Sequence, residues 1–144
     1  MISRIVLLFT LMSAVTNSLS EPGKSLEARI AGKKWQRRVV LVYARDAGNA
    51  DLVAQKRVFA EQRTGFTERD FDQIVVLESD LTEADRTYLR GGDRKLSPTA
   101  GFMTYLIGKD GGVKQRFSKP VATSELFQIV DAMPMRQSEM GRKN

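Results

Sequence analysis

The sequence predicts an α/β fold in which a central mixed four-stranded sheet is flanked by helices in the order βαβαββα. Two short apolar runs, residues 38–44 and 73–78, are separated by a helical segment, which is typical of a βαβ unit with parallel strands. A glycine-rich turn then joins two further strand-like runs, which indicates an antiparallel hairpin. An amphipathic segment after the hairpin predicts a closing helix.

The N-terminal half is expected to form a short helix and then the βαβ unit. In SLEARIA (25–31), apolar residues four apart favour a short helix that ends at Gly32. The run RVVLVYA (38–44) is apolar on both faces, as in a central strand covered on each side. Asn49 is a suitable N-cap for a helix over residues 50–63, and QIVVLE (73–78) predicts the second strand. We expect the polar residues between that helix and that strand to form a loop.

A second helix is expected to precede the third strand. Thr82 and Asp85 form a variant of the capping box at its start, and the apolar residues Leu81, Ala84 and Tyr88 lie on one side. Residues 93–101 are rich in turn formers and predict a loop. The apolar run at 102–107 predicts the third strand.

The hairpin and the closing helix complete the predicted domain. Asp110-Gly111 lies between apolar runs and predicts the turn, because glycine accepts a positive φ without steric cost. The fourth strand is expected at 113–117, with its odd-numbered residues on one face. Thr123 or Ser124 is expected to cap the closing helix, which Pro134 breaks or kinks.

The first twenty residues predict a secretory signal peptide. Arg4 supplies a positive charge, residues 5–15 form an apolar run, and Ser18 and Ser20 are small residues suited to cleavage near Ser20. The run is too short to span a bilayer, which needs about 20 apolar residues. We therefore expect an exported, periplasmic protein whose mature chain has no transmembrane segment.

The remaining chain is long enough for one domain with a single core. We expect a signal peptide over 1–20, an N-terminal extension with a short helix over 21–34, and the main domain over 35–144. Removing Arg4 with the signal lowers the formal charge from +6 to +5. This excess favours anionic partners without requiring one. Nucleic acid is not an expected partner outside the cytoplasm.

The sequence has no cysteine and no histidine, and this excludes several chemistries. Without a thiol there is no disulfide and no thiol redox reaction. Without histidine, the commonest general base near neutral pH is missing, and so are Ser-His-Asp and Cys-His nucleophiles and Cys/His zinc sites. Carboxylates, lysines, tyrosines and hydroxyls remain for chemistry. We expect no cofactor, no metal and no catalytic residue.

The glycine-rich stretch LIGKDGGVKQRF (106–117) is the most motif-like part of the sequence. A phosphate-binding P-loop needs Gly-Lys followed by Ser or Thr at the start of a helix. Here Asp110 follows Gly108-Lys109, and a strand comes next. The hairpin turn is therefore the favoured interpretation.

A basic stretch surrounds Trp35. It could bind an anionic lipid head group or polymer, giving weak contact with an anionic surface. The favoured alternative is a solvated strand entrance at which Trp35 covers the core and long basic side chains lie over apolar surface. The four cations of this basic patch are Lys33, Lys34, Arg37 and Arg38.

Two further groups of residues have a functional alternative. Carboxylates in two short spans could ligate calcium or form a glycosidase-like pair, but solvated charge balanced by nearby arginines is favoured. These carboxylates are Glu68, Asp70, Asp72, Glu78, Asp80, Glu83 and Asp85. Clustered thioethers could bind copper(I), but core or surface packing is favoured for Met133, Met135 and Met140.

Four stretches of the sequence resemble a known family. They are WQRRVVLVYA (35–44), TERD (67–70), FMTYLIGKDGGVKQRF (102–117) and LFQIVDAMPMRQSEM (126–140). They resemble the bacterial family called domain of unknown function 4174, small exported proteins related to a domain of extracellular sushi-repeat proteins. The resemblance covers nearly all of the chain after residue 20. It implies a thioredoxin-like, somewhat peroxiredoxin-like fold and no established activity.

The resemblance also indicates where a site would lie. In redox-active thioredoxin-like proteins the cysteines follow the first strand, and a nearby groove holds an extended peptide. Here the corresponding loop contains Arg45, Asp46 and Asn49 and no thiol. We expect a redox-inactive module that binds an unknown envelope protein or peptide through this loop and through Gly101 and Phe102. An envelope enzyme that uses carboxylates or lysine is the alternative.

Overall fold

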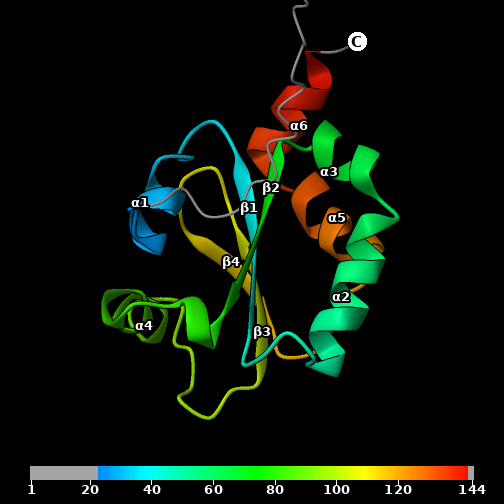
Figure 1. The fold of residues 1–144 in the computed structure, drawn as a ribbon. Helices are drawn as coiled ribbons and strands as arrows, with labels where there is room; N and C mark the ends of the chain where they lie inside the picture. Colours follow the sequence, from blue (N-terminus) through cyan, green and yellow to red (C-terminus); the bar gives the residue numbers. More distant parts are fainter. Residues whose placement is uncertain (1–22, 143–144) are drawn as a thin grey trace, which may run out of the picture.

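The structure is a computed structural model that describes residues 23–142 (Figure 1). The predicted signal peptide lies outside the described residues. The elements are α1 (Leu26–Ala31), β1 (Arg38–Ala44), α2 (Ala50–Ala60), α3 (Arg63–Glu68), β2 (Phe71–Leu77), the 3-10 turn η1 (Glu78–Asp80), α4 (Glu83–Arg90), β3 (Phe102–Ile107), β4 (Val113–Phe117), α5 (Thr123–Asp131) and α6 (Pro134–Gly141).

The four strands form one mixed sheet in the order β2-β1-β3-β4. β1 is parallel to β2 and antiparallel to β3, and β3 is antiparallel to β4. The predicted α/β class and the mixed four-stranded sheet are therefore confirmed. No helix within residues 23–142 is long and apolar enough to cross a bilayer.

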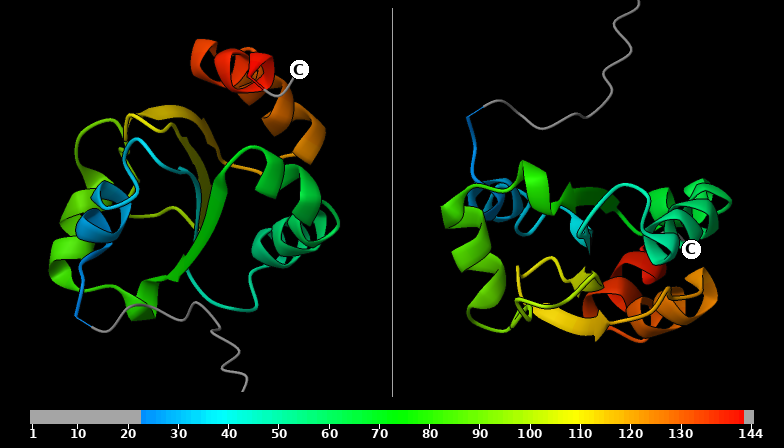
Figure 2. Two further views of the ribbon diagram at one scale, coloured as in Figure 1. Left: turned by 90° about the horizontal axis from the view of Figure 1, so that it is seen from above. Right: turned by 60° about the horizontal axis from the view of Figure 1, so that its bottom comes forward.

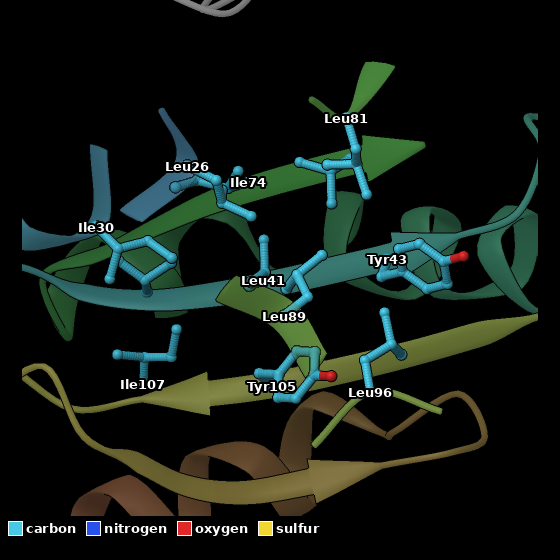
Figure 3. Close-up of a cluster of buried hydrophobic side chains, with 12 residues drawn as sticks. Leu26, Ile30, Leu41, Tyr43, Ile74, Leu81, Leu89, Leu96, Tyr105 and Ile107 are labelled. Atoms are coloured by element: carbon cyan, nitrogen blue, oxygen red, sulfur yellow. The ribbon is translucent and has the colours of Figure 1, made fainter. Parts of the chain in front are cut away.

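Helices cover both faces of the sheet, so the domain has three layers (Figure 2). α1 and α4 pack on one face, over a core that includes Leu41, Tyr43 and Tyr105 (Figure 3). α2, α3 and α5 pack on the other face, where Leu106 and Leu126 are fully buried. Every residue of β1 is buried because this strand lies inside the sheet and is covered on both sides.

The expected loop over 64–72 is wrong, because it contains the helix α3 and the start of β2. Its sequence, RTGFTE, has one large apolar residue and so gives no helical period. That residue, Phe66, is buried and packs edge-on against Phe59, Phe71 and Phe127, with ring centroids 5.0 to 5.3 Å apart. Tertiary aromatic packing therefore holds a helix that the local pattern does not predict.

The capping box of α4 is confirmed, and of the residues expected on one side of this helix Leu81 is buried and Tyr88 is half-buried. Ala84 is exposed, while Asp85 and Leu89 are buried. The Asp85 carboxylate accepts hydrogen bonds from the backbone N–H of Thr82 at 3.1 Å and of Leu26 at 2.9 Å. Asp85 therefore caps α1 as well as α4, and this double role explains why a charged residue faces the core.

The turn of the β3–β4 hairpin is confirmed, with Gly111 at φ +84°. The expected face of β4 is wrong, because the register shifts between Leu106 and Ile107. This bulge places Val113 against the α1/α4 side and Phe117 against the other side. β4 is an edge strand, as its polar sequence predicts.

The C-terminal segment forms two helices. Ala122 precedes α5 without a side-chain cap, so neither Thr123 nor Ser124 is the N-cap. Pro134 follows α5 and also begins α6. It occupies the first turn of α6, where a backbone N–H would have no partner within the helix, so the missing N–H of proline is tolerated. Met133, between the two helices, packs against the core beside α5.

Candidate functional site

The candidate site is formed by two loops at the carboxyl end of β1. Residues 45–49 connect β1 to α2, and residues 97–102 lead into β3. The carbonyl oxygen of Gly101 accepts hydrogen bonds from the Arg45 backbone N–H at 2.9 Å and from Asn49 Nδ2 at 3.2 Å. This acceptor holds the two loops side by side, and we call them the loop pair.

Two predicted site residues stabilise the loop pair with their side chains. The Arg45 guanidinium donates to the carbonyl oxygens of Pro98 at 2.9 Å and Ala100 at 3.3 Å. Asn49 has a second role, because its Oδ1 accepts a hydrogen bond from the Leu52 N–H at 3.0 Å and so caps α2. The sequence predicts this cap correctly.

The other three predicted residues differ in exposure. Gly101 lies beside Asn49, Asp46 is exposed on the first loop, and Phe102 is buried in the core. The structure therefore brings Arg45, Asn49 and Gly101 together, and it places Phe102 beside them with its side chain largely buried.

A shallow cleft of about 390 Å³ lies beside the loop pair. Residues that the sequence does not single out complete its walls. Asp51 and Lys119 lie across from each other with a nitrogen–oxygen distance of 3.6 Å, and Lys119 is exposed. Met103 and Ser118 also line the cleft. No local signal marks Ser118 and Lys119, because only the path of the chain after β4 brings them to Asn49.

The arrangement offers hydrogen-bonding groups and apolar contact rather than a reactive group. The first loop carries arginine, aspartate, alanine and glycine where a thiol would be needed. Two tyrosines are also unsuited to act as bases. Burial raises the pKa of Tyr105 to about 12. Burial and the hydrogen bond to Glu78 raise the pKa of Tyr43 to about 12.

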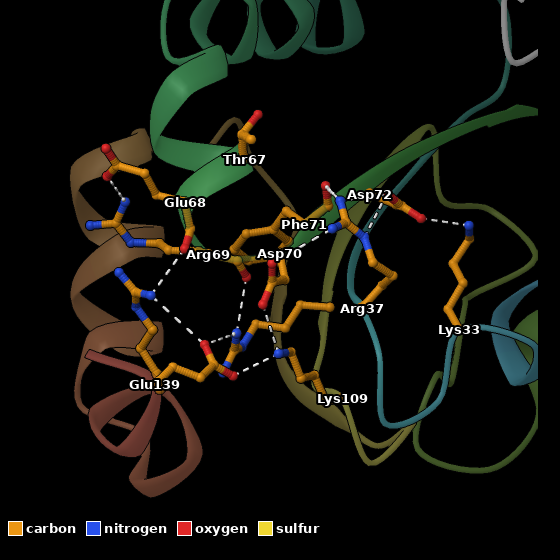
Figure 4. Close-up of polar contacts among 12 residues, drawn as sticks. Lys33, Arg37, Thr67, Glu68, Arg69, Asp70, Phe71, Asp72, Lys109 and Glu139 are labelled. Atoms are coloured by element: carbon orange, nitrogen blue, oxygen red, sulfur yellow. Dashed lines mark hydrogen bonds and ion pairs between the residues drawn. The ribbon is translucent and has the colours of Figure 1, made fainter. Parts of the chain in front are cut away.

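The predicted basic patch takes part in ion pairs (Figure 4). The Lys33 ammonium lies 2.5 Å from Asp72, and the Arg37 guanidinium lies 2.9 Å from the same carboxylate. Arg38 is buried rather than solvated, with its side chain 1% exposed, and it pairs with Glu139 at 3.1 Å. Lys34 has no carboxylate within ion-pair distance among residues 23–142.

Trp35 does not cover the core, so that part of the favoured interpretation is wrong. Its side chain is 64% exposed, and its backbone has a φ of +68°, which turns the chain just before β1. The Lys34 ammonium lies 5.6 Å from the centre of its ring. The tryptophan and Lys34 therefore remain on the surface while their neighbours are paired.

The carboxylates of the first acidic span are also paired with cations. Lys109 lies 2.8 Å from Asp70 and 2.6 Å from Glu139, so it links the hairpin to α6 (Figure 4). The hydrogen bond from Lys109 lowers the pKa of Asp70. Burial alone would raise the pKa of Glu139, but hydrogen bonds from Arg38 and Lys109 hold it below its usual range. We call these linked pairs, from Lys33 to Glu139, the ion-pair network.

In the second acidic span, Glu78 and Asp85 have structural roles of the same kind. Glu78 accepts a hydrogen bond from Tyr43 at 2.7 Å and pairs with Arg86 at 2.8 Å, and both interactions lower its pKa. Within the described residues no three or more His, Cys, Asp or Glu side chains are grouped to hold a metal ion. The lowered pKa values of Glu78 and Asp85 favour their ionised forms near neutral pH, so neither carboxyl is held protonated as a general acid.

The fold and the cysteine-free loop define a thioredoxin-like domain without thiol chemistry. The chain belongs to the family described as Domain of unknown function (DUF4174), which matches residues 29–139, and this confirms the expected family. No curated protein matches the sequence.

Two solved peroxiredoxin structures are similar to this one. The reduced 2-Cys peroxiredoxin of Plasmodium vivax is similar with a TM-score of 0.56 at 12% identity, over 75% of this chain and 71% of that chain. A cysteine-to-serine variant of peroxiredoxin 6 from Arenicola marina is similar with a TM-score of 0.49 at 13% identity, over 73% and 64% of the two chains. At these identities the first likeness concerns the fold alone.

Proposed function

We propose that this protein is an exported, redox-inactive module that binds a protein or an extended peptide of the cell envelope beside the loop pair. The observation that carries the proposal is the double hydrogen bond to the Gly101 carbonyl oxygen. It fixes the two loops next to the cleft of about 390 Å³. A fixed cleft lowers the entropy cost of ordering a bound chain.

The chemistry of the cleft favours binding over catalysis. Its walls offer the Asn49 amide, the Met103 side chain and the paired charges of Asp51 and Lys119. An extended chain can use such groups through its own amides and one apolar side chain. Export is supported by Arg4 and the apolar run of residues 5–15.

The alternative functions have weaker support. An enzyme that uses carboxylates would need a carboxylate that is free to contact a substrate. Asp70, Asp72 and Glu78 instead form ion pairs with lysine or arginine side chains. Contact with an anionic surface through the basic patch would depend mainly on Lys34 and Trp35, because the other three cations are paired. Both alternatives therefore rank below the binding module.

Replacing Arg45 and Asp46 by alanine together is expected to abolish co-purification of the envelope partner. The guanidinium that supports residues 98 and 100 is lost, and so is an exposed carboxylate on the first loop. The measurement is an affinity purification of the tagged full chain from a cross-linked envelope fraction, with quantitative identification of the bound proteins.

The double variant Lys56→Ala with Glu61→Ala is the matched control. Both residues are exposed, Lys56 within α2 and Glu61 at its C-terminal cap, and neither belongs to the loop pair. Thermal unfolding of each variant verifies that it is folded. If the loop variant is folded and retains the same partners as the control, the loop pair is not the binding site.

A further inference from the structure

The outer edge of β2 is an unpaired strand edge inside a large groove. β2 is the first strand of the sheet order β2-β1-β3-β4, so within residues 23–142 one of its sides has no neighbouring strand. The groove has a volume of about 550 Å³ and lies along this side between α1 and α3. Figure 2 shows β2 at the margin of the sheet, between the two helical layers.

The direction of the free backbone groups follows from the pairing with β1. The Arg38 N–H donates to the Asp70 carbonyl oxygen, and Arg38 is the register partner of Phe71. In a parallel ladder, the odd-numbered residues of β2 then direct their N–H and C=O groups away from β1. Arg37 donates to the Phe71 carbonyl oxygen at 2.9 Å, which agrees with this assignment.

Gln73 and Val75 are therefore residues whose backbone N–H and C=O groups point away from β1, and Gln73 also lines the groove. Both are exposed, and Val75 is one of the exposed large apolar residues, with 43% of its surface accessible. The pairing of β2 with β1 has no register shift, so the edge is regular. The β4 edge differs, because a bulge and the exposed Lys114 and Arg116 disfavour strand addition there.

Charge around the groove selects the kind of strand that fits. Arg29, Lys33 and Arg63 line it from α1, from the turn after α1 and from α3. Among the described residues that line it, Asp72 alone is acidic. Asp72 is already paired with Lys33 and Arg37, so an acidic ligand would meet the guanidinium groups of Arg29 and Arg63.

We propose that the β2 edge binds an extended acidic peptide segment by strand addition, at a site separate from the loop pair. The peptide backbone pairs with the N–H and C=O groups of Gln73 and Val75, and its carboxylates lie near Arg29 and Arg63. Backbone pairing of this kind gives affinity, and the flanking charges give selectivity.

The test measures fluorescence anisotropy of a labelled octapeptide of alternating valine and glutamate, with blocked ends, titrated with the purified full chain. We expect saturable binding that weakens when salt is raised from about 50 to about 300 mM. The same peptide with lysine in place of glutamate is expected to bind at least about tenfold more weakly.

Two variants test the geometry separately. Gln73→Pro removes an N–H that does not bond to β1, so the sheet is retained while strand addition is lost. Gln73→Ala, which keeps that N–H, is its control and is expected to bind as the wild type. Arg63→Glu is expected to weaken binding about tenfold. Its matched control is Arg57→Glu, at an exposed position of α2 outside the groove.

Any result that differs from these expected results contradicts the proposal. Equal binding of the acidic and basic peptides removes the charge argument, and full binding by folded Gln73→Pro removes strand addition. Absence of binding to the acidic peptide removes both. A dimer in sedimentation experiments that Gln73→Pro dissociates would assign the edge to a second copy of the chain instead.

Discussion

Replacing Glu139 by glutamine is expected to lower the free energy of unfolding by about 3 kcal/mol. The Arg38 side chain is 1% exposed, and both of its terminal nitrogens reach Glu139, at 3.1 and 3.2 Å. Glutamine removes the negative charge and one of the two acceptor oxygens, so the buried guanidinium loses its charge partner while its hydrogen bond to the Arg69 carbonyl oxygen remains. Urea denaturation of the variant should show a lower midpoint with an unchanged slope.

Glu125→Gln is the matched control, because Glu125 is exposed on α5. It is expected to change the unfolding free energy by less than about 0.5 kcal/mol. Replacing Arg38 by methionine and Glu139 by leucine together should recover much of the loss, because no buried charge then remains unpaired. Equal stability of Glu139→Gln and Glu125→Gln would show that the ion-pair network does not stabilise the domain.

The Glu139→Gln variant should also be less sensitive to acid than the wild type. The folded protein holds the pKa of Glu139 below its ordinary value of 4.5. Its contribution to stability is therefore complete above pH 4.5 and is lost as the pH falls through the lowered folded-state pKa. Stability curves measured between pH 7 and pH 3 should converge for the two proteins at the acid end.

Replacing Gln55 by alanine is expected to cost about 2 to 4 kcal/mol and to weaken partner binding. The buried amide of Gln55 donates to the Val121 carbonyl oxygen at 2.9 Å and accepts from the Val121 N–H at 2.8 Å. Alanine leaves both backbone groups buried without a partner. The nearby segment with Ser118 and Lys119, which borders the cleft, loses its buried hydrogen bonds to α2 and keeps the exposed ion pair between Lys119 and Asp51.

The matched control for Gln55→Ala is Gln128→Ala, at an exposed position of α5. Denaturation measures the stability of both variants, and the affinity purification measures partner recovery at a temperature where both are folded. A Gln55→Ala variant as stable as Gln128→Ala would mean that the Val121 groups find other partners and that Gln55 does not fix the cleft.

Local patterns in the sequence predict most of the framework. The two continuous apolar runs, the Asp110-Gly111 turn and the caps at Asn49 and Thr82 each act within a few residues, so their signals are readable. α3 is missed because Phe66 is held by aromatic rings from other elements. The β4 bulge is missed because the alternation of its residues conceals the shift in register.

The candidate site is predicted in part for the same reason. The resemblance indicates the loops of Arg45, Asn49 and Gly101, which the structure brings together. A local sequence pattern does not show which residues distant in sequence will form a hydrogen bond or an ion pair. Arg38 pairs with a residue 101 positions away, and Gln55 bonds to one 66 positions away. The basic patch shows the consequence, because three of its four cations form buried or half-buried ion pairs in the fold, whereas Lys34 stays exposed.

Photo-crosslinking in the intact envelope tests the central claim most directly. A photoreactive amino acid is placed at Ser118, on the wall of the cleft, and separately at Gln137, an exposed position on α6 outside it. The binding module predicts a discrete crosslinked protein or peptide from position 118 and none from position 137. No adduct from position 118, or the same adducts from both positions, would contradict binding at the loop pair.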